Sequence, residues 1–242
     1  LKFDKFNISL ISSGINLVQN LSFAVNKGES FGIVGESGSG KSLTALAALG
    51  LLNKKIFKTT GDVSIDNKNL NSMTASELNN IRGNKISMIF QEPMLSLNPV
   101  KSLHSQIIEC IDISDKKLNL DDVKEALIAV GLNDTKKILN SFPHMISGGQ
   151  RQRFMIAMSI LRKPSIIIAD EPTTALDVTL QKQILDTLNN LKNDMNMSMV
   201  LISHDIELIK RYCDYIAVMK DGSIVEKETT NKIFSCPKHD YT

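Results

Sequence analysis

The chain has 242 residues, of which 42% are hydrophobic, so it can bury a sizeable core as one large or two small domains. Its 28 basic and 26 acidic residues leave a net charge of +2, which gives no electrostatic case for a nucleic-acid partner. No window approaches the roughly 18 apolar residues of a membrane-spanning helix, and no signal peptide is visible at Leu1–Asp4. Cys110, Cys213 and Cys236 are odd in number and far apart, a pattern that fits neither a zinc nor an iron–sulfur site.

The first thirty residues predict short strands. The segments Phe3–Ile8 and Leu21–Val25 alternate apolar and polar residues, and Asn26–Gly28 reads as a turn. A similar strand is expected at Gly61–Asp66. Other segments are continuous apolar runs, which are typical of parallel strands covered on both faces. These buried strands are predicted at Phe31–Val34, Ser87–Phe90, Ile166–Asp170 and Met199–Ser203.

A glycine-rich segment follows the first apolar run and precedes a predicted helix, Leu43–Leu52. It reads Gly35-Glu36-Ser37-Gly38-Ser39-Gly40-Lys41-Ser42 and fits the phosphate-binding pattern G-x-x-x-x-G-K-S/T. Its glycines let the backbone turn tightly and approach a phosphate, while the loop N–H groups and the helix N-terminus face the anion. Lys41 supplies a charge for the β- and γ-phosphates, and Ser42 offers a hydroxyl to Mg²⁺. The strand–loop–helix context favours nucleotide binding over a chance Gly/Ser-rich turn.

The middle of the chain has the residue spacing of helices. Asp121–Val130 and Gly149–Leu161 both show it, so residues of about 95–160 are expected to form a mostly helical subdomain. Further on, Ala217–Val225 predicts a hairpin with an Asp-Gly turn. We expect residues 1–242 to form a single nucleotide-binding domain.

Polar residues follow the predicted buried strands. Asp170 ends one strand at the carboxyl edge of the sheet, where α/β proteins bind ligands, and is predicted to hold Mg²⁺ through water. Gln91 follows another strand, and its amide oxygen can reach Mg²⁺ or an attacking water. Glu171 is next to Asp170, and His204 follows a further strand. Each residue alone also fits a structural or surface role, but the phosphate-binding loop favours the functional one.

Several longer motifs coincide in order along the chain, at Gly35–Ser42, Met88–Pro99, Ile146–Arg153 and Ala169–Thr179. Together they resemble the ATP-binding subunits of ABC transporters and, within that group, the peptide/nickel importer ATPases. The resemblance runs from about Leu21 to the last residue. It implies an α/β ABC ATPase cassette: a P-loop NTPase core of the RecA-like kind, with an antiparallel β subdomain and an α-helical subdomain.

The resemblance also implies roles for individual residues. Glu171 is the general base or positions the attacking water, Gln91 belongs to the Q-loop, and His204 contacts the γ-phosphate. Ser147-Gly148-Gly149-Gln150 is the family signature, which closes on the γ-phosphate bound by a second ATPase subunit. Asp177 lies across the same interface. Ser147 also fits a plain helix N-cap, which exposes N–H groups to an anion.

One feature departs from the family pattern. Family members often stack an aromatic residue on adenine, but the corresponding region around Ser12 holds no Trp or Tyr. Base stacking would then come from Ile15 or Phe6, or be weak. Adenine recognition is therefore less well defined by the sequence than phosphate binding.

The function that the resemblance implies is ATP-driven import. The chain would bind and hydrolyse ATP with Mg²⁺, dimerise, and transmit closure to membrane permeases through a groove near Pro93–Val100. Its expected partners are a second ATPase subunit (a paralogue or another copy), two permeases and, indirectly, an extracytoplasmic binding protein, which puts it at the cytoplasmic face of a bacterial membrane. Cargo stays open between oligopeptides, dipeptides and nickel or metal chelates.

Two alternative functions use the same phosphate-binding loop. A soluble ABC ATPase of translation or DNA repair usually carries two cassettes or a long coiled-coil insertion, and this sequence shows neither. A small GTPase or kinase would explain neither Gln91 nor the signature at Ser147–Gln150.

Overall fold

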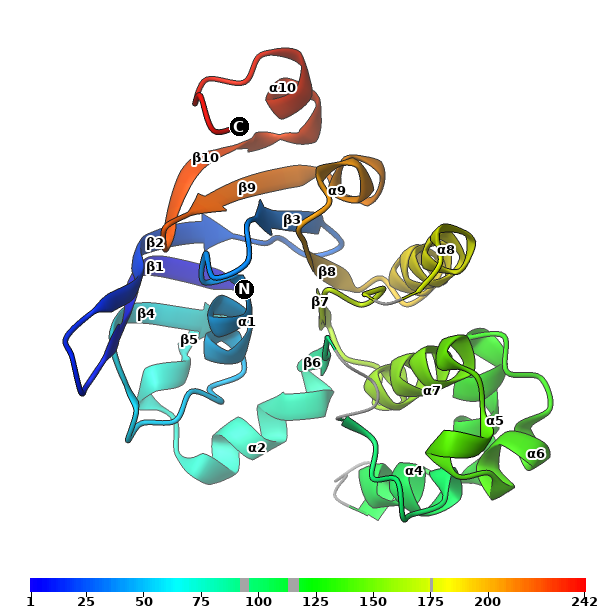
Figure 1. The fold of residues 1–242 in the computed structure, drawn as a ribbon. Helices are drawn as coiled ribbons and strands as arrows, with labels where there is room; N and C mark the ends of the chain where they lie inside the picture. Colours follow the sequence, from blue (N-terminus) through cyan, green and yellow to red (C-terminus); the bar gives the residue numbers. More distant parts are fainter. Residues whose placement is uncertain (92–95, 113–117, 175) are drawn as a thin grey trace. The chain divides into compact units, whose positions relative to one another are not determined.

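The computed structural model describes residues 1–91, 96–112, 118–174 and 176–242. The chain divides into two compact units, whose elements are labelled in Figure 1. The first unit holds Leu1–Arg82 and Ser198–Thr242, and the second holds Gly83–Met197. Pro93, part of the predicted permease groove, and Ala175, in the motif before Asp177, lie outside the described residues.

The first unit is built mainly of strands. Its elements are β1 Lys2–Leu10, β2 Asn16–Ala24, β3 Ser30–Gly35, α1 Lys41–Ala48, β4 Phe57–Ile65, β5 Lys68–Asn69, the 3₁₀ turn η1 Leu70–Ser72, β8 Ser198–Ser203, α9 Ile206–Tyr212, β9 Tyr215–Lys220, β10 Ser223–Thr229 and α10 Thr230–Ser235. One sheet is antiparallel with the order β2-β1-β4-β5, and the other strands follow the order β10-β9-β3-β8. Strand β3 pairs parallel with both β8 and β9, while β10 is antiparallel to β9.

The predicted strands and turns of this unit are confirmed, and several strands are longer than expected. The hairpin turn between β9 and β10 has positive φ at both central residues, 47° at Asp221 and 79° at Gly222, as a tight Asp-Gly hairpin requires. The predicted helix Leu43–Leu52 instead begins at Lys41 and ends at Ala48. It stops there because Gly50 adopts φ 63° and the N–H of Leu51 donates back to the carbonyl of Leu46, which closes the helix end.

Aromatic packing joins the two sets of strands in the first unit. The rings of Phe3 and Phe23 stack with centroids 4.8 Å apart, and Phe23 stacks on Phe31 of β3 at 4.9 Å. Phe6 meets Phe3 edge-on at 5.5 Å and is only 2% exposed. This buried cluster fixes the antiparallel sheet against the strand that leads into the phosphate-binding loop.

The second unit is mainly helical around two parallel strands. Helix α2 Ala75–Asn84 leads into it, and its further elements are β6 Ile86–Ile89, α4 Leu103–Asp112, α5 Leu120–Ala129, α6 Thr135–Asn140, η2 Pro143–Met145, α7 Gly148–Ile160, β7 Ile166–Asp170 and α8 Val178–Asp194. Strands β6 and β7 pair in parallel from Ile86 opposite Ile166 to Ile89 opposite Ala169. All their residues are buried, as predicted for continuous apolar runs. The first run was predicted one residue too long, since β6 ends at Ile89 and Phe90 is 39% exposed.

The helices predicted in the middle of the chain are present. Asp121–Val130 corresponds to α5 and Gly149–Leu161 to α7, each one residue earlier at its start and end. Asn119 caps α5 by accepting the N–H groups of Asp121 and Asp122, which explains why that helix begins where it does. Over the ranges that the structure describes, no helix is both long and apolar enough to cross a membrane. The bounds of the helical subdomain, like the single-domain organisation, stay predictions.

Candidate functional site

The phosphate-binding loop connects β3 to α1 in the first unit. Gly38 and Gly40 adopt φ 83° and 97°, conformations that L side chains rarely take. Gly40 is the N-cap of α1, and no side chain caps that helix. The first N–H groups of α1 therefore have no side-chain acceptor and are suited to bind an anion.

Gly35 also has a packing role, which the sequence did not suggest. Its φ is not positive, and it ends β3 opposite Met219 of β9. A Cβ at this position would lie 2.2 Å from the carbonyl oxygen of Met219 and 2.8 Å from Oγ of Ser39. Close packing against β9 thus excludes a side chain at Gly35.

Lys41 lies across the loop that it follows. Its Nζ donates to the carbonyl oxygens of Gly35 and Glu36, both at 2.8 Å, and the residue is only 5% exposed. The loop carbonyls thereby hold a buried ammonium group beside the N-terminus of α1. The hydroxyl of Ser39 is also buried in this loop, without a hydrogen-bond partner among the described residues. A phosphate would provide acceptors for such donors.

His204 follows β8 and belongs to the same unit as the loop. It lines a cavity of about 300 Å³ together with Val34, Gly35, Glu36, Ile206, Val218, Tyr241 and Thr242. The structure therefore brings His204 and the start of the phosphate-binding loop to the walls of one cavity. The other histidines, His104, His144 and His239, are exposed.

Gln91 and Glu171 meet in the second unit. Nε2 of Gln91 donates to Oε2 of Glu171 at 3.1 Å, so two residues 80 positions apart lie together after strands β6 and β7. Glu171 has φ 45°, an uncommon conformation for a residue with a side chain and one that often marks a functional position. Thr174 supports this conformation, since its Oγ1 donates to the backbone carbonyl and to Oε2 of Glu171, both at 3.1 Å.

The oxygen donors predicted for Mg²⁺ suit that ion. Asp170 is the last residue of β7 and is 4% exposed, while Ser42 is exposed in the first turn of α1. The amide nitrogen of Gln91 donates to Glu171, and the oxygen of the same amide group is a possible ligand. Carboxylate, hydroxyl and amide oxygens are the hard ligands that Mg²⁺ takes together with substrate phosphates.

The signature Ser147-Gly148-Gly149-Gln150 forms a capping box on α7. Oγ of Ser147 accepts the N–H of Gln150 at 3.2 Å, and Oε1 of Gln150 accepts the N–H of Ser147 at 3.0 Å. Gly149 packs closely against α8, because a Cβ there would lie 2.8 Å from Leu180. Asp177 is exposed and caps α8 by accepting the N–H of Leu180 at 2.9 Å. Both predicted interface motifs thus form capped helix N-termini.

A shallow pocket of about 220 Å³ lies beside the segment that follows β6. It is lined by Ser87, Met88, Phe90, Ser96, Leu97, Met155, Met158 and Ser159. The side chain of Phe90, the residue before Gln91, is 39% exposed. The pocket combines flexible methionines with an exposed aromatic ring, a combination typical of surfaces that bind another protein.

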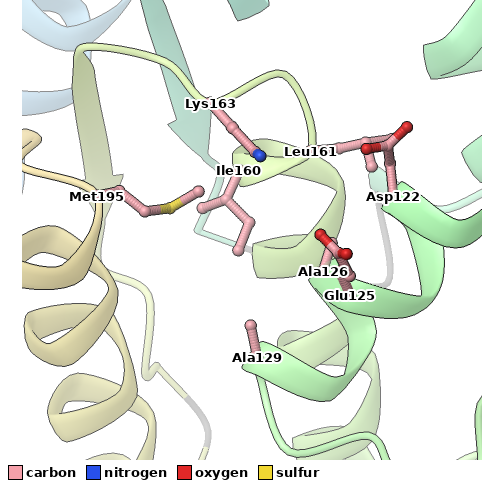
Figure 2. A pocket seen from close by; sticks show the side chains of 8 residues that line it. All are labelled: Asp122, Glu125, Ala126, Ala129, Ile160, Leu161, Lys163 and Met195. Carbon is pink, nitrogen blue, oxygen red and sulfur yellow. The ribbon is translucent and has the colours of Figure 1, made fainter. Parts of the chain in front are cut away.

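A separate pocket of about 200 Å³ lies between α5 and the ends of α7 and α8. It is lined by Asp122, Glu125, Ala126, Ala129, Ile160, Leu161, Lys163 and Met195. Figure 2 shows Met195 on the side opposite α5. None of these eight residues belongs to the predicted site, and the pocket mixes acidic, basic and apolar groups.

Sequence reasoning missed two residues near the candidate site. Thr174 donates a hydrogen bond to Glu171, and the one sequence signal for this contact is its position three residues after the glutamate, the spacing of a turn. Tyr241 accepts a hydrogen bond from the loop residue Glu36, and nothing in the sequence indicated this long-range contact. The structure also excludes Phe6 as a residue that stacks on adenine, because its ring is buried in the core, whereas Ile15 is 58% exposed.

Comparisons with known proteins find ATP-binding proteins of ABC transporters. The family described as ABC transporter matches residues 18–174. The chain is 43% identical to the oligopeptide transport ATP-binding protein OppD of Haemophilus influenzae, over 94% of this chain and 71% of that protein. It is 42% identical to the oligopeptide transport ATP-binding protein AppD of Bacillus subtilis, again over 94% and 71%. The peptidoglycan transport ATP-binding protein YejF of Agrobacterium fabrum is 43% identical, but the chain spans only 42% of it.

Solved structures agree with the sequence relatives. A dimeric ATP-binding cassette in a post-hydrolysis state, bound to ADP and Pi, superposes with a TM-score of 0.81 and 28% identity, over 95% of this chain and 98% of that one. CbiO1 of Clostridium perfringens, part of the ABC transporter complex CbiONQ, gives a TM-score of 0.78 at 24% identity, over 97% of this chain and 90% of that one. The fold is that of an ABC ATPase cassette.

Proposed function

The chain belongs to the ABC transporter family, and from this premise we propose that it is the ATP-binding and ATP-hydrolysing subunit of a peptide importer. The observation that carries the proposal is the hydrogen bond between Gln91 and Glu171, which joins two predicted catalytic residues from distant parts of the sequence. The phosphate-binding loop would bind the ATP that these two residues hydrolyse. No relative named above is a factor of translation or DNA repair, the alternative that the sequence left open.

Phosphate binding in this proposal rests on the loop Gly35–Ser42. The uncapped N-terminus of α1 and the ammonium of Lys41 provide donors for the β- and γ-phosphates. Ser42, Gln91 and Asp170 would hold Mg²⁺, which neutralises charge on the phosphates. Phosphoryl transfer to water depends mainly on positioning and electrostatics, so a few fixed groups suffice.

Glu171 would orient the attacking water and take its proton. The hydrogen bonds from Gln91 and Thr174 both reach Oε2, and so fix the carboxylate's orientation. His204 would contact the γ-phosphate from the cavity that it lines with the start of the loop. These roles give each polar residue of the candidate site a separate task.

A second ATPase subunit would complete each site. The capped N-termini at Ser147 and Asp177 carry backbone N–H groups that would meet a phosphate held by another subunit. ATP would then join the two subunits and hydrolysis would release them. We expect the partner to be a paralogue, with a second copy of this chain as the other case. Hydrolysis per chain should therefore rise with chain concentration.

Coupling to the membrane would use the pocket around Phe90 and Leu97. Phe90 in its wall directly precedes Gln91 in the chain, which would connect the candidate site to a docked permease segment. Two permeases would bind in this way at the cytoplasmic face of a bacterial membrane, and an extracytoplasmic binding protein would deliver cargo. The relatives' names favour peptides as cargo, whereas nickel or metal chelates rest on the sequence resemblance alone.

The test is to tag the chain in its native cell, solubilise the membranes gently and identify co-purifying proteins by mass spectrometry. We expect two multi-span permeases and a second ATPase, with a binding protein whose bound ligand identifies the cargo. A Phe90→Ala variant should lose the permeases but retain the second ATPase, since it alters only the proposed docking pocket. Recovery of ribosomal or DNA-repair proteins without any permease would refute the import function.

A further inference from the structure

The last residues of the chain lie against the phosphate-binding loop within the first unit. The N–H of Glu36, the second residue of the loop, donates to the hydroxyl oxygen of Tyr241 at 3.2 Å. Tyr241 also lines the cavity that contains Gly35, Glu36 and His204. The tyrosine therefore contacts the loop directly, from a segment about 200 residues further along the chain.

A series of interactions fixes this tyrosine in place. Glu226 of β10 accepts the N–H groups of Lys238 at 2.9 Å and His239 at 3.1 Å, one with each carboxylate oxygen. Nδ1 of His239 then accepts the N–H of Tyr241 at 3.1 Å. The ammonium of Lys220 lies 4.9 Å from the centre of the Tyr241 ring, within the range of a cation–π interaction. The segment is thus tied to both strands of the β9–β10 hairpin.

The hydrogen bond from Glu36 acts on a peptide group that also determines the position of Lys41. The carbonyl of Gly35 and the N–H of Glu36 belong to one planar trans peptide, so they point in opposite directions. The carbonyl accepts Nζ of Lys41 at 2.8 Å, and the N–H donates to Tyr241. Each of these two hydrogen bonds restrains rotation of the peptide plane, and the geometry of the other bond depends on that plane.

We propose that Tyr241 is a positioning residue for nucleotide binding, which fixes the Gly35–Glu36 peptide and through it the ammonium of Lys41. This role rests on the proposed function, in which Lys41 binds the β- and γ-phosphates. The hydroxyl oxygen is the acting group, and the ring serves to carry it to the loop. Removing that oxygen leaves the N–H of Glu36 without its acceptor and frees the peptide to rotate.

The experiment compares Tyr241→Phe with Tyr215→Phe in the full chain. Tyr215 is 40% exposed on β9, so this control removes a surface hydroxyl from the same hairpin. Amide hydrogen exchange of Glu36 is followed by NMR without nucleotide, and Mg-ATP affinity is then measured by calorimetry. Since the acceptor of the Glu36 N–H is lost, we expect exchange about 2- to 10-fold faster and binding about 2- to 10-fold weaker in Tyr241→Phe, with neither changed in the control.

The two readouts separate this role from the proposed function. Unchanged exchange at Glu36 overturns the role, and so does faster exchange with unchanged ATP affinity, because the bond would then be structural only. A wild-type chain that does not bind Mg-ATP would refute the proposed function itself, whatever the exchange shows. If Tyr241→Phe does not fold, Lys220→Met removes the cation over the ring and should shift both readouts in the same direction.

Discussion

Replacing Thr174 with valine should slow ATP hydrolysis while leaving ATP binding intact. The change keeps the shape of the side chain but removes the hydroxyl that donates to Oε2 of Glu171 at 3.1 Å. The backbone carbonyl of Glu171 keeps a second donor, the N–H of Thr174 at 3.2 Å, so the turn itself should persist. The lost bond therefore affects mainly the orientation of the carboxylate.

The size of the effect follows from the strength of that hydrogen bond. A bond to a charged group contributes about 1.5–3 kcal/mol, and we take about 1 kcal/mol because Glu171 is only half-buried. If this energy is realised in the transition state, kcat falls about fivefold and KM stays the same. Gln91 still donates to the same oxygen, which sets the upper limit of the loss.

Steady-state phosphate release from Mg-ATP measures this prediction. Thr59→Val is the matched control, since Thr59 is exposed on β4 in the first unit. In a Glu171→Gln background the Thr174 change should have no further effect, because both act on one catalytic group. A kcat equal to that of the wild type, or an equal additional loss in the Glu171→Gln background, would refute the role of Thr174.

Two further predictions concern stability. Gly35→Ala should lower the free energy of unfolding by about 1–3 kcal/mol, since its Cβ would overlap the carbonyl oxygen of Met219. Gly38→Ala has open space around its Cβ and should incur only the cost of its positive φ, about 1–2 kcal/mol. Thermal unfolding of both variants measures this, and equal stability of Gly35→Ala and wild type would contradict it. Burial opposes ionisation of Glu226, but hydrogen bonds from the backbone N–H groups of Lys238 and His239 outweigh it and lower the pKa of its carboxyl group. Its stabilising effect is therefore present above the usual glutamate pKa and is lost as the pH falls through the lowered value. Glu226→Gln should accordingly melt below the wild type at pH 7 and together with it at acidic pH, and a gap in melting temperature that does not depend on pH would rule this out.

Local patterns in the sequence predicted most of the fold. The apolar runs at Ile166–Asp170 and Met199–Ser203 became fully buried strands, because continuous hydrophobic residues suit a strand covered on both faces. The end of α1 was placed too late, since the positive φ of Gly50 outweighs the apolar residues after it. Helix ends depend on a single backbone conformation, and a hydrophobic pattern does not encode it.

The candidate site shows the same division. The glycine-rich motif identified the phosphate-binding loop, but the packing of Gly35 against Met219 depends on a strand pairing across about 180 residues. The contact of Tyr241 with Glu36 has the same long-range origin, and a single sequence contains no signal for it. The sequence also did not predict the positive φ of Glu171, because this conformation follows from the surrounding structure rather than from the residue type.

The most direct test of the central claim is the rate of phosphate release from Mg-ATP by wild type, Lys41→Ala and Glu171→Gln. It should be measured against chain concentration, for the chain alone and with the ATPase that co-purifies with it. We expect loss of binding in Lys41→Ala, and a fall in rate of about 10²-fold or more with ATP still bound in Glu171→Gln, as expected when a general base is removed. A Glu171→Gln variant that hydrolyses ATP at the wild-type rate would contradict the role of Glu171 in hydrolysis.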